Sequence, residues 1–143
     1  MTPDAIFPVA NAVALVGWIV LAVAPHRRWS SLLASTIVPS LLSAVYVALI
    51  AAFWAGSEGG FSSLSAVAAL FENRWLLLAG WTHYLAFDLL IGSWEARDAS
   101  RRGIPHLMLV PSLILTFLFG PAGWLLYLGT RAIVKPSPTV RAA

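Results

Sequence analysis

Cysteine is absent from this chain of 143 residues, and charged side chains are scarce. Without cysteine, disulfides, thiolate metal sites and cysteine nucleophiles are all excluded. Charged residues make up 10% of the sequence, whereas an ordinary soluble domain contains about 25%. The shortage of charge therefore argues against a soluble domain.

Apolar residues take the place of the missing charges. They make up 59% of the sequence and gather in runs long enough to cross a hydrocarbon core of about 30 Å. We expect one all-α integral membrane protein, a four-transmembrane-helix bundle with a short amphipathic interfacial helix between spans two and three. The expected spans are about residues 5–24, 31–54, 75–94 and 106–130, with the interfacial helix at about 61–72 and a disordered tail at 135–143.

The net charge of +3 does not indicate nucleic-acid binding, because the basic residues flank the apolar segments as membrane anchors do. The short loops after spans one and three hold five of the nine basic residues, so we expect these loops in the cytoplasm and both termini outside. A re-entrant fourth segment would instead move the tail to the cytoplasmic side. The small residues of the first two spans also make a homodimer an expected assembly.

The third apolar segment carries ionisable residues, which are costly inside a membrane span and mark functional sites. His83 and Asp88 lie in its body, and Glu95 and Asp98 lie at its end. At about 100° per residue, His83 falls about 140° from Asp88, so one regular helix does not bring them into contact. The residues that share one stripe are Trp81, Tyr84, Asp88, Gly92 and Glu95.

Asp88 is a candidate general acid, because a medium of low dielectric favours the neutral form of a carboxyl. Its structural alternative is a protonated carboxyl that bridges helices through Tyr46, Ser43 or Asn11. His83 has three interpretations: acid–base catalysis, haem ligation or a hydrogen bond between helices. No other histidine is expected at its depth, which argues against haem held by two histidines, and no cofactor is predicted.

A second group of polar residues is expected at one end of the bundle. Mixed nitrogen and oxygen ligands suit a divalent metal. The alternative is that the two carboxyls pair with nearby arginines. The four residues of this candidate metal site are His26, Glu95, Asp98 and His106.

Two motifs carry a family resemblance. The segment Trp81-x-His83-x-Leu85-Ala86-x-Asp88-Leu89 resembles the signature of the plant abscisic-acid-deficient-four, or neoxanthin synthase, family and its bacterial relatives. The later Leu118-Phe119-x-Pro121-x-Gly123 resembles the last-helix motif of that family. The resemblance covers segments three and four, and the first half only by general layout. The chain starts almost directly at its first apolar segment, so we expect a bacterial-type member, multi-pass in the bacterial inner (cytoplasmic) membrane.

The resemblance implies a membrane-embedded enzyme that modifies carotenoids or related isoprenoids, because plant members are required to convert violaxanthin into the allenic neoxanthin. Opening an epoxide to an allenic alcohol needs an acid and a base but no redox cofactor. Asp88 is the expected acid and His83 the expected base. The expected substrate-binding residues are Tyr84, Trp81, Asn11, Trp18 and Tyr46.

Two other functions remain open at this point. The first is a non-enzymatic membrane protein that binds a carotenoid or assists assembly of a pigment complex. The second is a metal-dependent lipid enzyme, which would need the four candidate ligands to converge. In every case the expected partners are membrane lipids and a hydrophobic polyene substrate or ligand, and not nucleic acid.

Overall fold

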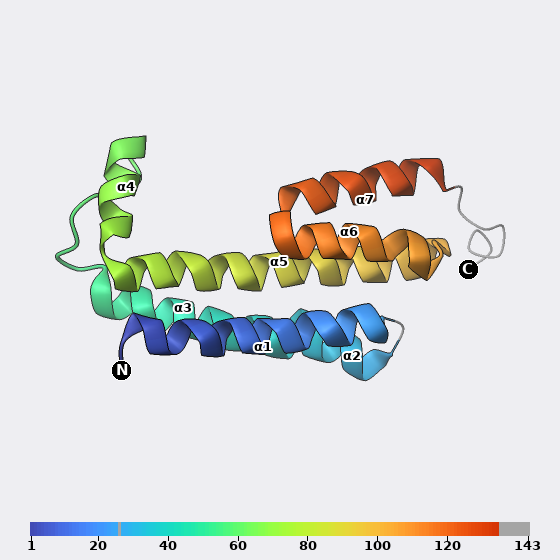
Figure 1. The fold of residues 1–143 in the computed structure, drawn as a ribbon, viewed down its shortest axis with the longest axis horizontal. Coiled ribbons are helices and arrows are strands. Elements are labelled where there is room, and N and C mark those ends of the chain that lie inside the picture. The colour runs from blue at the N-terminus through green and yellow to red at the C-terminus, as the bar shows by residue number, and fades with distance from the viewer. Residues whose placement is uncertain (26, 135–143) are drawn as a thin grey trace.

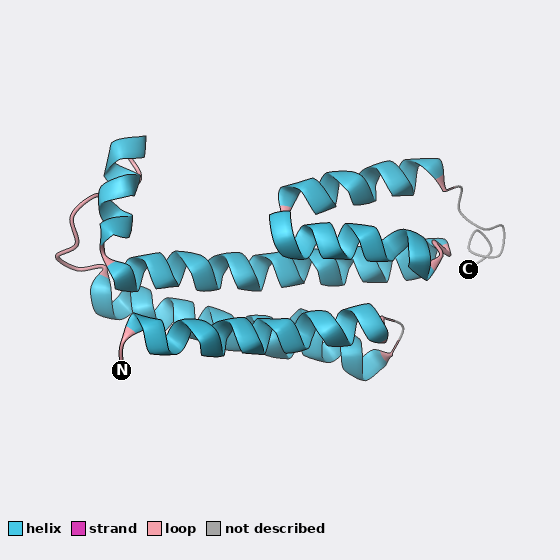
Figure 2. Ribbon diagram, in the orientation of Figure 1, coloured by secondary structure: helices cyan, strands magenta, loops and turns pink. Residues whose placement is uncertain are grey.

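The structure, a computed structural model, describes residues 1–25 and 27–134. All regular secondary structure in these residues is helical (Figure 2). The tail at 135–143, expected to be disordered, lies outside the described residues. The helices are α1 (Pro3–Val23), α2 (Arg28–Leu32), η1 (Leu33–Ile37), α3 (Val38–Phe53), α4 (Leu64–Glu72), α5 (Arg74–Arg102), α6 (His106–Phe119) and α7 (Pro121–Ile133).

Three helical stretches are long and apolar enough to cross a membrane. They are α1, the continuous stretch Arg28–Phe53 formed by α2, η1 and α3, and α5. These apolar helices indicate a membrane protein and confirm the all-α class. They correspond to the first three expected spans, although α5 extends eight residues beyond the predicted end at 94.

The fourth expected span, at 106–130, is not confirmed as a span. The segment breaks at Gly120 into α6, with 14 residues, and α7, with 13. Each helix is about 20 Å long at 1.5 Å per residue, which is shorter than a hydrocarbon core of about 30 Å. Figure 1 shows α6 running back along α5 and α7 folding back over α6. The architecture is therefore three long helices and a helical hairpin.

The sequence at positions 120–123 explains the hairpin. Pro121 is the first residue of α7, a position that needs no backbone N–H donor and suits the fixed φ of proline. Gly123 then lies directly against α6, since a Cβ at this position would overlap the backbone of Thr116. Two helices can approach this closely only where one of them has no side chain.

The second span contains a π-helical turn. Residues Leu33–Ile37 form a π-helical turn just before Pro39. A proline ring clashes with the carbonyl four residues earlier, here that of Ser35, and π-helical geometry relieves such a clash. The Ser35 hydroxyl donates to the Ser31 carbonyl oxygen at 2.6 Å.

Helix α4 crosses the end of α5 at a steep angle, as expected of a helix that lies along a membrane surface (Figure 1). The Ser63 hydroxyl caps it by accepting from the Ala66 N–H at 3.1 Å. This cap sets the start of the helix at Leu64, three residues after the expected start at about 61.

Helix α5 is the centre of the bundle, with α1, α3 and α6 packed around it. The core includes Trp18 of α1, Leu42 of α3, Leu89 of α5 and Leu113 of α6. Gly92 allows α1 to come close, because a Cβ there would lie 2.5 Å from the Trp18 ring. The stripe predicted on α5 thus faces α1 and the hairpin.

Candidate functional site

The α5 stripe meets the turn of the hairpin, defined here as residues 117–121, at Asp88. A Cβ added to Gly120 would lie 2.6 Å from Asp88 Oδ1, so the carboxyl rests directly on the backbone of the turn. Asp88 Oδ2 is buried and has no hydrogen-bond partner among the described residues. Any residue larger than glycine at position 120 would displace this carboxyl.

Asp88 lies in a buried position beside two helix ends. Burial favours the neutral acid. Gly120 is both the C-cap of α6 and the N-cap of α7, so the two helix dipoles act on the carboxyl with opposite signs. Burial is the influence that remains, and a carboxyl in this position is suited to hold a proton for donation.

Tyr84 joins α5 to the same turn. Its hydroxyl donates to the carbonyl oxygens of Phe117, at 3.4 Å, and Leu118, at 3.2 Å. The last carbonyls of a helix have no partners within it, and lipid supplies none. Tyr84 therefore stabilises the break in the hairpin. It also lies one helical turn from Asp88, close enough for the two side chains to interact.

Trp81 continues the stripe toward the N-terminal end of α5. Its Nε1 donates to Asn11 Oδ1 at 3.1 Å, and Asn11 Nδ2 donates to the Phe7 carbonyl oxygen at 2.7 Å. The Trp81 ring centroid lies 5.3 Å from that of Tyr84 and 5.4 Å from that of Phe7. Asn11 and Trp81, both expected substrate-binding residues, are thus joined by a hydrogen bond between α1 and α5.

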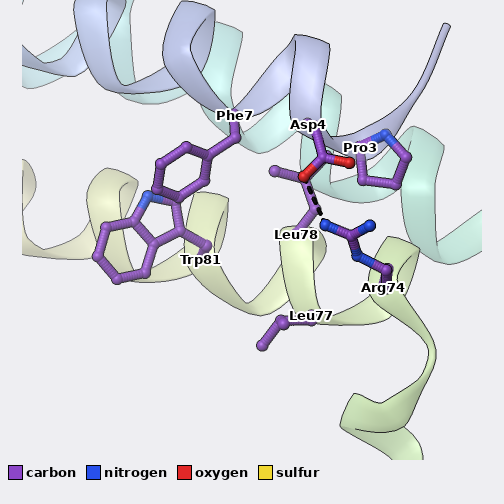
Figure 3. A pocket seen from close by; sticks show the side chains of 7 residues that line it. All are labelled: Pro3, Asp4, Phe7, Arg74, Leu77, Leu78 and Trp81. Atoms are coloured by element: carbon purple, nitrogen blue, oxygen red, sulfur yellow. Dashed lines mark hydrogen bonds and ion pairs between the residues drawn. The ribbon is translucent and has the colours of Figure 1, made fainter.

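A cavity of about 200 Å³ opens beside Trp81, between the N-terminal parts of α1 and α5. Figure 3 shows the Phe7 and Trp81 rings side by side and the ion pair between Asp4 and Arg74. The lining residues are Pro3, Asp4, Phe7, Arg74, Leu77, Leu78 and Trp81. The rings of Phe7, Trp81 and Tyr84 therefore form a continuous row between this cavity and Asp88.

His83 lies on another face of α5 and does not share this site. Its ring stacks on Phe87 at 4.4 Å between centroids and lies 5.4 Å from the Tyr46 ring. His83 and Tyr46 line a separate cavity of about 270 Å³ beneath α4, together with Trp54, Phe61 and Phe71. Asp88, the expected acid, does not line this cavity, in agreement with the angle of about 140° that a regular helix places between it and His83.

Trp18 belongs to the core and to a third cavity. It is 6% exposed and lies 5.5 Å from the Phe117 ring between centroids. The cavity that it lines with Phe117 is apolar and has a volume of about 170 Å³. The predicted substrate residues therefore divide among three places on the bundle.

Glu95 lies deeper in the bundle than its place in the sequence predicts. It was expected at the membrane interface, yet its side chain is fully buried. Thr116 Oγ1 donates to its two carboxyl oxygens at 3.0 and 3.2 Å. Its place on the same stripe as Asp88 is the signal that points to the interior.

The carboxyls of the candidate metal site have other partners. Asp98 accepts from the Tyr127 hydroxyl at 2.8 Å and pairs with Arg102 at 2.9 Å and Arg131 at 3.1 Å. Pairing with arginine is therefore confirmed for Asp98. His26 lies outside the described residues, and within residues 1–25 and 27–134 no three histidines or carboxylates gather closely enough to hold a metal ion. His106 begins α6.

Comparison with known proteins identifies the family. The ABA DEFICIENT 4-like family matches residues 5–127. The chain belongs to this family. The match runs from the start of α1 to Tyr127 in α7, so it covers the first two spans as well as the two motifs in α5 and the hairpin. No curated protein and no solved structure matches the chain.

Proposed function

We propose that this member of the ABA DEFICIENT 4-like family is a membrane-embedded enzyme that isomerises an epoxide to an allene on a carotenoid or related isoprenoid. The observation that carries the proposal is the Asp88 carboxyl at the hairpin turn, with one oxygen that lacks a partner. Asp88 lies 14 residues from either end of α5, about 21 Å along the helix axis. A long apolar substrate is the kind of molecule that can reach this depth.

The proposed reaction begins with proton transfer from the neutral Asp88 carboxyl to the epoxide oxygen. The bond between this oxygen and the ring carbon next to the polyene breaks, leaving a hydroxyl on one carbon and a positive charge on the other. Loss of the vinylic proton beside the cation then forms the allene. The product has the composition of the substrate, so no oxidant or reductant is needed.

We assign the second proton transfer to the Asp88 carboxylate instead of His83. His83 lines the other cavity, whereas the new carboxylate stands beside the cation that it formed. Taking up the vinylic proton restores the neutral acid and closes the cycle without exchange of a net proton. The rings of Trp81 and Tyr84 would stabilise the cation on the way.

A second candidate function is storage or delivery of a carotenoid without conversion. It is favoured by the cavity beneath α4, whose lining is largely apolar and aromatic. In this alternative His83 and Tyr46 would contact a polar end of the ligand. For either function we propose a location in the cytoplasmic membrane of a bacterium.

The test is expression of the chain in a bacterium that accumulates violaxanthin, followed by chromatography and mass spectrometry of the extracted pigments. The unmodified protein should yield a product with the mass of the substrate and a changed retention time. Asp88→Asn should lower conversion by about 10²-fold or more, the typical contribution of a general acid. Glu72→Gln, which alters an exposed carboxyl of α4 that lines none of these cavities, is the matched control.

The same experiment separates the alternatives. His83→Ala should leave conversion within a few fold of the unmodified protein, because Asp88 performs both proton transfers. Conversion by Asp88→Asn at the unmodified rate would refute the catalytic assignment. Pigment that purifies with the protein in stoichiometric amount, unconverted in every variant, would establish storage in place of catalysis.

A further inference from the structure

Four arginines surround one hollow at the end of the bundle where α2 begins and α5 ends. The hollow has a volume of about 220 Å³, and Figure 1 places the two helix ends at the same side of the molecule. We call it the arginine hollow. The polar residues that line it are Arg27, Arg28, Ser31, Arg97, Ser100 and Arg101.

The arginines of the hollow have no acidic partner in the described part of the chain. The ion pairs found there involve Arg74, Arg102 and Arg131 instead. Arg102 and Arg131 share Asp98 on another side of the same helix end. The hollow thus gathers four positive charges that repel one another, and an anion would turn this repulsion into attraction.

Ordinary helix electrostatics explains only part of this arrangement. Arg101 lies in the last turn of α5, where the helix dipole favours a cation. Arg27 and Arg28 instead open the helical stretch Arg28–Phe53, where the dipole disfavours a cation. A preference for basic loops on one side of a membrane places arginines in both segments, but it does not require them to line one hollow.

We propose that the arginine hollow binds the phosphate group of an anionic phospholipid. Guanidinium groups bind phosphate oxygens through paired hydrogen bonds, and basic pockets between membrane helices are sites for anionic headgroups. The surroundings favour a lipid over a free anion. Trp29 is 58% exposed and Leu32 is 55% exposed, and both flank Ser31 in the chain, where acyl chains of a bound lipid could lie.

This inference does not depend on the proposed isomerase reaction. Its test uses the whole protein, purified in a mild detergent and stripped of lipid. Native mass spectrometry then measures the binding of added phospholipids. Phosphatidylglycerol should bind as one tight adduct, and phosphatidylcholine at least tenfold more weakly. Inorganic phosphate, added as a competitor, distinguishes the two sources of the phosphate group.

Substitutions test whether the hollow is the site. Each arginine near an anionic headgroup contributes about 1 kcal/mol, so Arg97→Gln should weaken phosphatidylglycerol binding about fivefold and Arg97→Gln/Arg101→Gln about thirtyfold. Arg74→Gln removes the same charge at the opposite end of α5 and should change binding less than twofold. Arg97→Lys/Arg101→Lys keeps the charge and should retain the preference for phosphatidylglycerol even if a glutamine variant fails to fold.

Three outcomes would overturn the proposal. The first is equal binding of phosphatidylglycerol and phosphatidylcholine to the unmodified protein. The second is equal loss of binding in Arg74→Gln and Arg97→Gln, which would reflect overall charge. The third is displacement of the lipid by inorganic phosphate at an equal concentration, which would assign the hollow to a soluble anion.

Discussion

At the scale of single residues, the molecule depends on polar groups that satisfy one another away from water. Tyr84 supplies the missing donors at the end of α6, and Thr116 supplies a donor to Glu95. Asp88 differs because one of its oxygens has no partner among the described residues. An unpartnered oxygen in a buried carboxyl is unfavourable unless another molecule contacts it, which is why Asp88 carries the proposed chemistry.

Tyr84→Phe should destabilise the protein by about 1–2 kcal/mol, because two carbonyl oxygens of the hairpin turn lose their donor. Thermal unfolding followed by circular dichroism in detergent measures the change. Tyr46→Phe is the matched control, since no hydrogen bond from the Tyr46 hydroxyl is seen among the described residues. An equal loss of stability in the two variants would contradict the role given to Tyr84.

At the scale of elements, the hairpin depends on glycines at two close approaches. Gly120 accommodates the Asp88 carboxyl, and Gly123 accommodates the backbone of α6. Gly129 lies in the same helix as Gly123, but an added Cβ there would meet nothing within 4 Å. The two glycines of α7 therefore have different physical roles despite being six residues apart.

Gly123→Ala and Gly129→Ala should change the stability in opposite directions. The first forces α6 and α7 apart and should cost about 1–3 kcal/mol. The second should stabilise the helix by about 0.5–1 kcal/mol, since alanine replaces a flexible residue in open space. Unfolding in a denaturing detergent measures the change in the free energy of unfolding for each variant. Destabilisation of equal size in the two variants would show that the hairpin is not packed as described.

The sequence predicts the long helices because each is a single apolar run, and it predicts the α5 stripe because a regular helix fixes the angle between residues. The hairpin is different. Residues on both sides of Gly120 are apolar, so composition alone does not distinguish a kinked span from two short helices. The difference lies in the contact between Gly123 and Thr116, which is a tertiary feature.

The candidate site was predicted in part for the same reason. The stripe placed Trp81, Tyr84 and Asp88 together, and the structure agrees. The depth of Glu95 was misjudged because the apolar run of α5 stops at Trp94, whereas the helix continues to Arg102. Contacts with α6, including the hydrogen bond from Thr116, bury Glu95, and in the sequence only its place on the stripe of Asp88 points to this depth.

At the scale of the whole molecule, the hairpin raises an alternative to the expected topology, with three crossings in place of four. Three crossings put the two ends of the described chain on opposite sides, whereas four crossings would return the chain to its starting side. Arg131, near the end of α7, pairs with Asp98 near the end of α5. The end of α7 therefore lies at the end of the bundle that holds the arginine hollow, as the re-entrant alternative required.

Labelling of single cysteines can decide between the two topologies, and the chain has no native cysteine to remove. Thr2→Cys and Glu58→Cys mark one end of the bundle, and Pro105→Cys and Ile133→Cys mark the other. With a maleimide that does not cross membranes, intact cells should label either the first pair or the second, and lysed cells should label all four.

The decisive position is Ile133, which is 79% exposed at the end of α7. Labelling together with Pro105→Cys supports a hairpin that enters and leaves on the same side. Labelling together with Thr2→Cys would mean that α6 and α7 cross the membrane as a fourth span, and Asp88 would then lie beside a kinked helix instead of a hairpin turn.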